Sequence, residues 1–188
     1  AVLDSHRELR RGHPEVIYCA GKTVAQIKML VAAMLDGDGD ILATRATEAM
    51  YRAVAKQCPA ARYNRLGRVI VIQRRERPLT ETTIAIITAG TSDLPVAEEA
   101  AETALLFGNR VERITDVGVA GLHRLLVRLE VIRAARVCIV IAGMEGALAS
   151  VVAGLVARPV IAVPTSVGYG ASFGGLAALL GMLTSCAG

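Results

Sequence analysis

Short apolar runs alternate with longer, periodic runs through the second half of the chain. A continuously apolar run indicates a buried parallel strand, because helices on both faces of such a sheet remove the alternation of polar and apolar positions. We predict strands at residues 83–89, 110–114, 136–142 and 159–164. Between and after them, apolar positions at helical spacing predict helices at residues 95–108, 121–135, 146–157 and 174–183.

The first half shows the same alternation with shorter elements. A charged segment over residues 2–11 is compatible with a helix that Gly12 and Pro14 would end. Thr47 is a candidate N-cap for a helix that runs to about residue 57. The other elements predicted here are strands at residues 15–20, 40–45 and 68–72 and an amphipathic helix at residues 24–35.

A polar stretch over residues 73–82, which contains Pro78, separates the two halves and predicts a domain boundary. We therefore expect a small, basic N-terminal α/β domain over residues 1–78 and a larger domain over residues 79–188. The larger domain should form a three-layer α/β/α sandwich around a parallel sheet, as in flavodoxin-like and Rossmann-like folds.

Composition and charge narrow the classes of protein that fit this fold. The chain is 53% hydrophobic but only 3% aromatic, which suits closely packed α/β layers. Residues 1–78 carry 14 Lys and Arg against 8 Asp and Glu, whereas residues 79–188 carry 7 against 9. The basic half is either a solvated face or a surface that attracts RNA, a membrane or a phosphorylated small molecule. The scarcity of aromatic side chains disfavours nucleic acid, because bases stack on such side chains.

An uncharged run over residues 159–188 raises the question of a membrane segment. It includes Gly170 and Gly174 at the GxxxG spacing of membrane helix pairs. Pro164 and the glycines divide the run into a strand, a loop and a helix that are each too short to span a bilayer, so we expect no membrane segment.

The cysteines also bear on the compartment. They form no CxxC pair and therefore indicate neither a zinc site nor a disulfide framework. Because the N-terminus also lacks an apolar core of signal-peptide type, we expect a cytoplasmic protein. Cys186 follows the last predicted helix and has no charged sequence neighbour, so its local sequence predicts an inert thiol. The four cysteines are Cys19, Cys58, Cys138 and Cys186.

Ligands of open parallel sheets bind at the carboxyl ends of the strands, which singles out three loops. In the first loop Gly90 allows close backbone approach, and Thr91, Ser92 and the free amides of a helix start favour a phosphate. Asp93 would either cap the helix or bind a ribose hydroxyl, and a capped turn without a ligand is the alternative. The loops span residues 89–93, 142–147 and 164–175.

The other two loops supply further candidates. Glu145 lies between small residues at a strand-to-helix turn, where it would either cap the helix or act as a general base. The third loop is rich in glycine, and we expect Ser166, Gly168 and Tyr169 to contact an anionic ligand. His123 lies in a helical pattern, where a histidine is more often structural than catalytic.

Several blocks of the sequence resemble known families. AGTSD (89–93) and GLHR (121–124) are similar to the GSxSD and SAHR segments of PurE, the aminoimidazole ribonucleotide carboxylase family. Nearly the whole chain resembles the LarB family, PurE-related proteins of lactate racemase cofactor synthesis. The resemblance implies a PurE-like fold for the larger domain. The blocks that carry it are PEVIYCAGKT (14–23), DVGVAGLHRLL (116–126), AGMEGALASVVAGL (142–155) and the glycine-rich run at 159–187.

The LarB resemblance implies a carboxylase and hydrolase acting on nicotinic acid adenine dinucleotide. Such an enzyme adds CO₂ to the pyridinium ring and splits the phosphoanhydride, giving pyridinium-3,5-biscarboxylic acid mononucleotide and AMP for a nickel-pincer nucleotide cofactor. It implies Cys186 as the nucleophile that activates the ring and Glu145 as the acid/base group. The residues implied to bind the substrate are Thr91, Ser92, Asp93, His123 and Arg124.

The resemblance also bears on cofactors and assembly. We expect no tightly bound cofactor, only Mg²⁺ that accompanies the substrate phosphates, and a homo-oligomer, most simply an octamer, because PurE-like domains assemble around their active sites. Lys22, beside a strand end in the basic half, is the candidate cationic contact to the dinucleotide. Chains of the LarB family continue past the matching cysteine with a further segment, whereas this sequence gives only two residues after Cys186.

Two other functions stay open at this point. A PurE-type carboxylase or mutase acting on aminoimidazole ribonucleotide needs no thiol to activate its substrate, because the aminoimidazole ring of that substrate is already an enamine. The chain reads GLHRLL (121–126) where that family has SAHRTP, which weighs against this activity. A non-catalytic nucleotide-binding regulator is the alternative from a different class.

Overall fold

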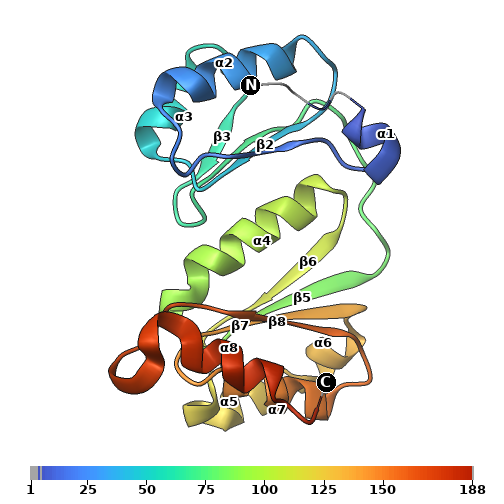
Figure 1. Ribbon diagram of the computed structural model, residues 1–188. Helices are drawn as coiled ribbons and strands as arrows, with labels where there is room; N and C mark the ends of the chain where they lie inside the picture. Colours follow the sequence, from blue (N-terminus) through green and yellow to red (C-terminus); the bar gives the residue numbers. More distant parts are fainter. Residues whose placement is uncertain (1–3, 5, 188) are drawn as a thin grey trace.

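The computed structural model describes residue 4 and residues 6–187. These residues form two sheets, one from each half of the chain, joined by an extended linker (Figure 1). The predicted helix at residues 2–11 is shorter in the structure, where α1 spans Arg7–Arg11 and ends at Gly12 in a left-handed conformation. Residues 1–3 and 5 lie outside the described part of the chain.

The N-terminal sheet has four strands in the order β1-β2-β4-β3. β1 and β2 are parallel, and β4 is antiparallel to both of its neighbours. Helices α2 and α3 cover one face, and the threonine before each helix accepts a hydrogen bond from the backbone N–H three residues on, which confirms Thr47 as an N-cap. The elements are β1 (Val16–Tyr18), α2 (Val24–Leu35), β2 (Ile41–Thr44), α3 (Glu48–Ala55), β3 (Arg62–Asn64) and β4 (Val69–Ile72).

The C-terminal sheet is parallel throughout, with the strand order β6-β5-β7-β8. One apolar layer joins it to α4 on one face, and a second layer joins it to α5, α6 and α7 on the other, so the predicted three-layer sandwich is confirmed. Its strands are β5 (Thr83–Thr88), β6 (Arg110–Ile114), β7 (Val137–Ala142) and β8 (Val160–Pro164). Its helices are α4 (Leu94–Leu106), α5 (Leu122–Val127), α6 (Leu129–Ala134), α7 (Ala147–Leu155) and α8 (Leu176–Leu183), with 3₁₀ turns at Thr91–Asp93, Val119–Gly121 and Gly170–Gly175.

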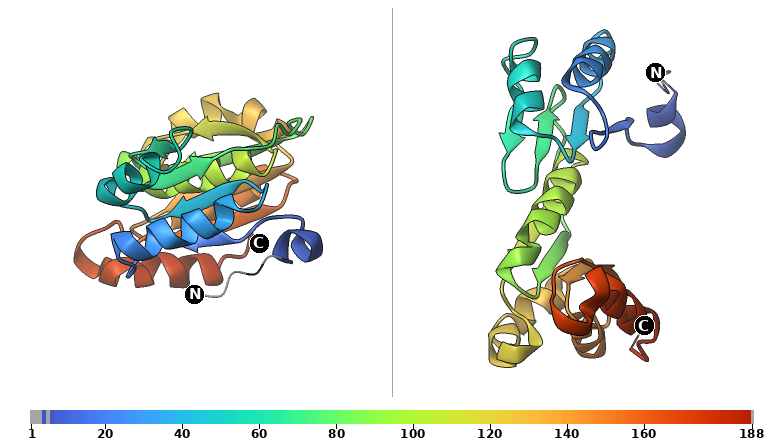
Figure 2. Two further views of the ribbon diagram at one scale, coloured as in Figure 1. Left: turned by 90° about the horizontal axis from the view of Figure 1, so that it is seen from above. Right: turned by 60° about the vertical axis from the view of Figure 1, so that its left-hand side comes forward.

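Helix α4 is shared by the two sheets. Figure 1 and the right view of Figure 2 show it between them. Its alanines pack on the C-terminal sheet, while Leu106 and the following Phe107 pack on the outer face of the N-terminal sheet. At the other end of α4, the turn between β3 and β4 lies so close that a Cβ on Gly67 would be 2.9 Å from the backbone of Glu98.

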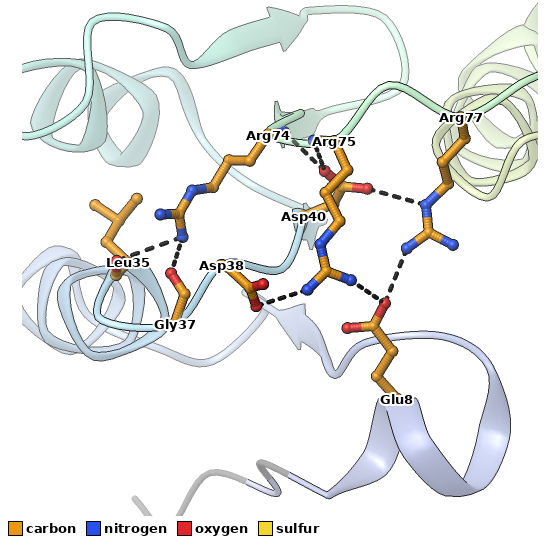
Figure 3. Close-up of polar contacts among 8 residues, drawn as sticks. All are labelled: Glu8, Leu35, Gly37, Asp38, Asp40, Arg74, Arg75 and Arg77. Atoms are coloured by element: carbon orange, nitrogen blue, oxygen red, sulfur yellow. Dashed lines mark hydrogen bonds and ion pairs between the residues drawn. The ribbon is translucent and has the colours of Figure 1, made fainter.

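The linker is fixed to the N-terminal domain by ion pairs (Figure 3). Arg75 reaches Glu8 of α1 at 2.8 Å and Asp38 at 2.6 Å, and Arg77 reaches the same Glu8 oxygen at 2.9 Å. Asp40, which is buried, accepts two backbone N–H groups of the linker and lies 3.4 Å from the Arg77 guanidinium. The linker is therefore an ordered part of the N-terminal domain.

The sequence pattern missed one strand and merged two helices. Strand β3 was not predicted, because it is a three-residue edge strand without an apolar run, paired only with β4. The single helix expected at residues 121–135 is two helices, α5 and α6. The chain leaves helical geometry at Arg128, whose guanidinium pairs with Glu112 of β6 at 2.9 Å.

Candidate active site

The strand order places a switch point at the carboxyl end of the C-terminal sheet. The chain leaves β5 toward β6 on one side and returns to β7 on the other, so the loops after β5 and β7 diverge. In parallel α/β sheets this divergence opens a crevice in which ligands bind. The structure has a cleft of about 480 Å³ at this point, a size typical of small-molecule sites.

Residues from four loops line this cleft. One loop follows each strand of the sheet. The lining residues are Gly90, Thr91 and Ser92 after β5; Asp116 and Gly118 after β6; Gly143, Met144 and Glu145 after β7; and Val167 and Tyr169 after β8. The three predicted loops thus meet in one place, and a fourth loop, which the sequence pattern did not single out, joins them. A second hollow, of about 220 Å³, lies in the N-terminal domain beside Asp38 and Asp40, whose carboxylates are already paired with the linker arginines.

The cleft loops are packed backbone against backbone. Met144 donates its N–H to the carbonyl of Val167 at 2.7 Å, and a Cβ on Gly143 would be only 2.0 Å from that oxygen. On the other side, Gly118 donates its N–H to the carbonyl of Ala89 at 2.9 Å. Position 143 therefore requires glycine because the loop after β8 approaches its backbone closely. The backbone conformation does not require it, since the φ of Gly143 does not lie in the left-handed region.

Asp93 joins the first loop to the third. Its carboxylate accepts the Gly90 N–H at 3.0 Å and the Thr165 hydroxyl at 2.7 Å, and only 2% of the residue is exposed. Both carboxylate oxygens are thus engaged within the protein. Asp93 occupies the N-cap position of α4 but makes no side-chain cap hydrogen bond to that helix. Its carboxylate instead closes the preceding turn and holds the loop after β8.

Thr91, Ser92 and Glu145 are exposed in the cleft. The two hydroxyls precede α4 and lie at the positive end of its helix dipole, although the Leu94 N–H donates to the Thr91 carbonyl and Pro95 has no N–H. Glu145 lies beside Gly146, which has a left-handed conformation (φ 72°) and begins α7. Two hydroxyls at the positive end of a helix and a carboxylate thus line a common cleft, an arrangement suited to binding a phosphorylated ligand and transferring a proton.

Tyr169 completes the cleft from the glycine-rich loop, with 80% of its surface exposed. Ser166 is exposed next to Thr165 but does not line the cleft. Gly168 packs so closely against Ser172 that a Cβ at Gly168 would lie 2.8 Å from that side chain. The loop therefore contributes one of its three candidate residues directly.

The remaining candidates lie outside the cleft. His123 is exposed on α5, and the Arg124 guanidinium bonds to Asp116 at the rim. Lys22 lies in the N-terminal domain, where its ammonium donates to the carbonyl of Tyr18 at 2.6 Å. The structure of one chain therefore brings together Thr91, Ser92, Asp93, Glu145 and Tyr169, but not the other candidates.

The cysteines differ in their environments. Burial raises the pKa of the Cys19 thiol to about 11, and burial also raises the pKa of Cys138. A thiolate is disfavoured at both positions. Cys58 is half-buried in the N-terminal domain, and Cys186 is the exposed cysteine, located after α8 and outside the cleft of its own chain.

Asp116 is the cleft residue that the sequence pattern did not reveal. It lies two residues after β6, so the signal that identifies it is its place at the carboxyl end of a predicted parallel strand.

Among residue 4 and residues 6–187, no three His, Cys, Asp or Glu side chains are arranged to hold a metal ion. In the same part of the chain, no helix is both long and apolar enough to cross a bilayer.

Comparison with known proteins agrees with this architecture. Residues 1–75 match the LarB/PurE-like N-terminal domain family, and residues 83–188 match the AIR carboxylase family. The chain belongs to the LarB family. It is also 40% identical over 194 residues to an uncharacterized protein of Methanocaldococcus jannaschii, in an alignment that covers 98% of this chain and 74% of the relative. The two LarB-family domains and the cleft indicate an enzyme of the PurE-related carboxylase type.

Proposed function

We propose that this LarB-family protein carboxylates the pyridinium ring of nicotinic acid adenine dinucleotide with CO₂ and hydrolyses its phosphoanhydride. The products are pyridinium-3,5-biscarboxylic acid mononucleotide and AMP, for nickel-pincer nucleotide synthesis. The observation that carries the proposal is the cleft at the switch point, which the start of α4 and the Glu145 carboxylate both line, in a chain with a LarB-type N-terminal domain.

The ring chemistry requires a nucleophile. A pyridinium is electron-poor and cannot attack CO₂ until a nucleophile adds to it and converts it into an enamine-like donor. We assign this step to the Cys186 thiolate, which forms a C–S bond to the ring. The enamine carbon then attacks CO₂, Glu145 removes the proton from the newly carboxylated carbon, and the restored aromatic ring expels the thiolate.

In this scheme we assign the thiol to the cleft of a neighbouring chain. Helix α8 packs on the Glu145–Gly146 turn, where a Cβ on Gly181 would be 2.5 Å from the Glu145 carbonyl oxygen, but Cys186 does not line the cleft of its own chain. Leu176, Leu179, Leu180 and Leu183 form an exposed apolar face on α8. A neighbouring copy that covers this face would explain its apolar character and bring one chain's thiol to another chain's cleft.

The other residues bind the dinucleotide in this proposal. Thr91 and Ser92 hold a phosphate at the positive end of the α4 dipole, together with any Mg²⁺ that the phosphates carry, and Tyr169 packs on the ligand. Lys22 lies outside the cleft of its own chain, so in this proposal the Lys22 of a neighbouring copy contacts the second phosphate or nucleoside.

Turnover followed by mass spectrometry tests the proposal. Purified protein with nicotinic acid adenine dinucleotide and bicarbonate should release AMP and the doubly carboxylated mononucleotide. Conversion of aminoimidazole ribonucleotide instead would establish the PurE-type activity. Nucleotide binding without turnover of either compound would favour a regulator.

Intact-protein mass spectrometry tests the thiol. The enzyme quenched during turnover should carry a covalent adduct, which Cys186→Ala and Cys186→Ser abolish together with activity. Cys58→Ala is the matched control and should behave like the wild type, because Cys58 lies in the other domain. Glu145→Gln should slow turnover and let the adduct accumulate. Full activity in Cys186→Ala would overturn the adduct and the role given to Glu145.

A further inference from the structure

Asp116 holds a carboxylate at the β6 end of the cleft in a fixed position. Its backbone has a left-handed conformation (φ 57°), and its N–H donates to the Thr88 hydroxyl at 3.2 Å. The next residue, Val117, donates its N–H to the Thr88 carbonyl at 3.1 Å. Thr88 is fully buried at the end of β5, so the central strand of the sheet anchors Asp116.

Arg124 holds the side chain of Asp116. Its Nη1 donates to Asp116 Oδ2 from the first turn of α5, and the guanidinium passes directly over Gly121. A Cβ at Gly121 would lie 2.5 Å from Arg124 Nε, so the absence of a side chain there gives Arg124 its path to the cleft. Within the described residues no hydrogen bond uses the other oxygen, Asp116 Oδ1.

This arrangement differs from that of Asp93. Both Asp93 oxygens are bonded within the protein, whereas Asp116 is 49% exposed and keeps one oxygen for a ligand. Glu145, the third carboxylate of the cleft, belongs to the loop after β7, on the far side of the Thr91–Ser92 loop from Asp116. The Thr91–Ser92 loop therefore lies between Asp116 on one side and Glu145, the proposed acid/base group, on the other.

The chemistry of the pair points to a hydroxyl ligand. An ionised carboxylate only accepts hydrogen bonds, and its charge here is already balanced by Arg124, so neither an anion nor a further cation is favoured. A ribose 2′,3′-diol offers two adjacent O–H donors and lies between the phosphate and the base of a nucleotide. Acidic residues after a strand bind ribose in this way in other α/β folds.

We propose that Asp116 binds the ribose diol of the nucleotide and that Arg124 is its positioning residue. Ribose binding, which the sequence analysis gave as one alternative for Asp93, is thus assigned to Asp116. The inference rests on the proposed function only in that the ligand is a ribonucleotide.

Calorimetric binding of nicotinic acid mononucleotide and its 2′-deoxy and 3′-deoxy analogues tests the inference. The wild type should bind the ribonucleotide about 10- to 100-fold more tightly than the deoxy analogues, the range expected for hydrogen bonds to a charged group. Asp116→Asn should reduce this ratio severalfold or more, and it should fold, because asparagine tolerates the left-handed conformation. Arg124→Gln should reduce the ratio less, and Glu145→Gln should retain it.

The outcomes separate this inference from the proposed function. If the nicotinic acid nucleotide fails to bind but AMP or aminoimidazole ribonucleotide binds, the same ribo-to-deoxy ratio measured with that ligand decides the inference, while the proposed substrate is wrong. An unchanged ratio in a folded Asp116→Asn overturns the inference even if the enzyme acts on the dinucleotide. Failure of every ribonucleotide to bind the wild type would overturn both.

Discussion

Gly143→Ala should disrupt the cleft without altering any charged or polar side chain. The added Cβ would lie 2.0 Å from the carbonyl oxygen of Val167 and 2.8 Å from the hydroxyl of Thr165. Ordinary contacts of a Cβ begin at about 3.4 Å, so the loop after β8 must move by more than 1 Å. Overpacking costs about 1–3 kcal/mol, and loss of the Met144–Val167 hydrogen bond costs about 0.5–1.5 kcal/mol, so we expect a destabilisation of about 2–4 kcal/mol.

Urea titration followed by circular dichroism measures this effect. With a slope of about 2 kcal/mol per molar urea, the midpoint of the C-terminal domain should fall by about 1–2 M. Gly90→Ala is the matched control in the same cleft, because its Cβ would meet nothing nearer than 3.9 Å and its φ of −131° suits any residue. It should change stability by less than about 0.5 kcal/mol. A Gly143→Ala variant as stable as Gly90→Ala would refute the close approach of these loops.

The contacts described above lead to four further predictions. Thr165→Val should lower the free energy of unfolding by about 1–3 kcal/mol, because it leaves a buried carboxylate oxygen without a donor, whereas Thr165→Ser keeps the hydroxyl and should cost less in the same urea titration. Arg77→Gln should lower the melting temperature measured by calorimetry, since it leaves a buried carboxylate unpaired, and Arg10→Gln, which breaks an exposed pair, should not. Lys22→Ala should raise KM for the dinucleotide and leave kcat unchanged, and an unaltered KM would remove this residue from the site. Light scattering at micromolar concentration should give an oligomer larger than a dimer, and a monomeric mass would contradict the role proposed for the apolar face of α8.

Elements with strong local signals could be predicted from the sequence. The bounds of α2 match the predicted range, because Thr23 forms a capping box with Gln26 at its start and a turn follows its end. The strands of the C-terminal sheet were predicted to within one residue at each end, since their apolar runs are long and bounded by polar or glycine positions. Strand β3 lacks such a run and depends on pairing with β4, a tertiary effect.

The candidate site could be predicted only in part, because its chemistry depends on distant contacts. Asp93 is engaged by Thr165, which is 72 positions away in the chain, so its sequence neighbours cannot reveal that both oxygens are bonded. Cys186 is placed by the direction of α8, and its relation to a cleft depends on assembly. Strand order, which no local pattern encodes, brings the four loops together.

Helix α4 has a consequence for how this chain can be recombined with its relatives. A chimaera that takes its N-terminal half from another LarB-family protein must rebuild the contacts of that half with this helix. The incoming turn must carry a glycine where Gly67 meets Glu98, and an amide where Asn64 donates to Glu98 and Glu102. We therefore expect a chimaera joined at the linker to fold only when both parent proteins carry these residues. Helix α4 follows the linker in sequence, but it packs against both halves of the chain.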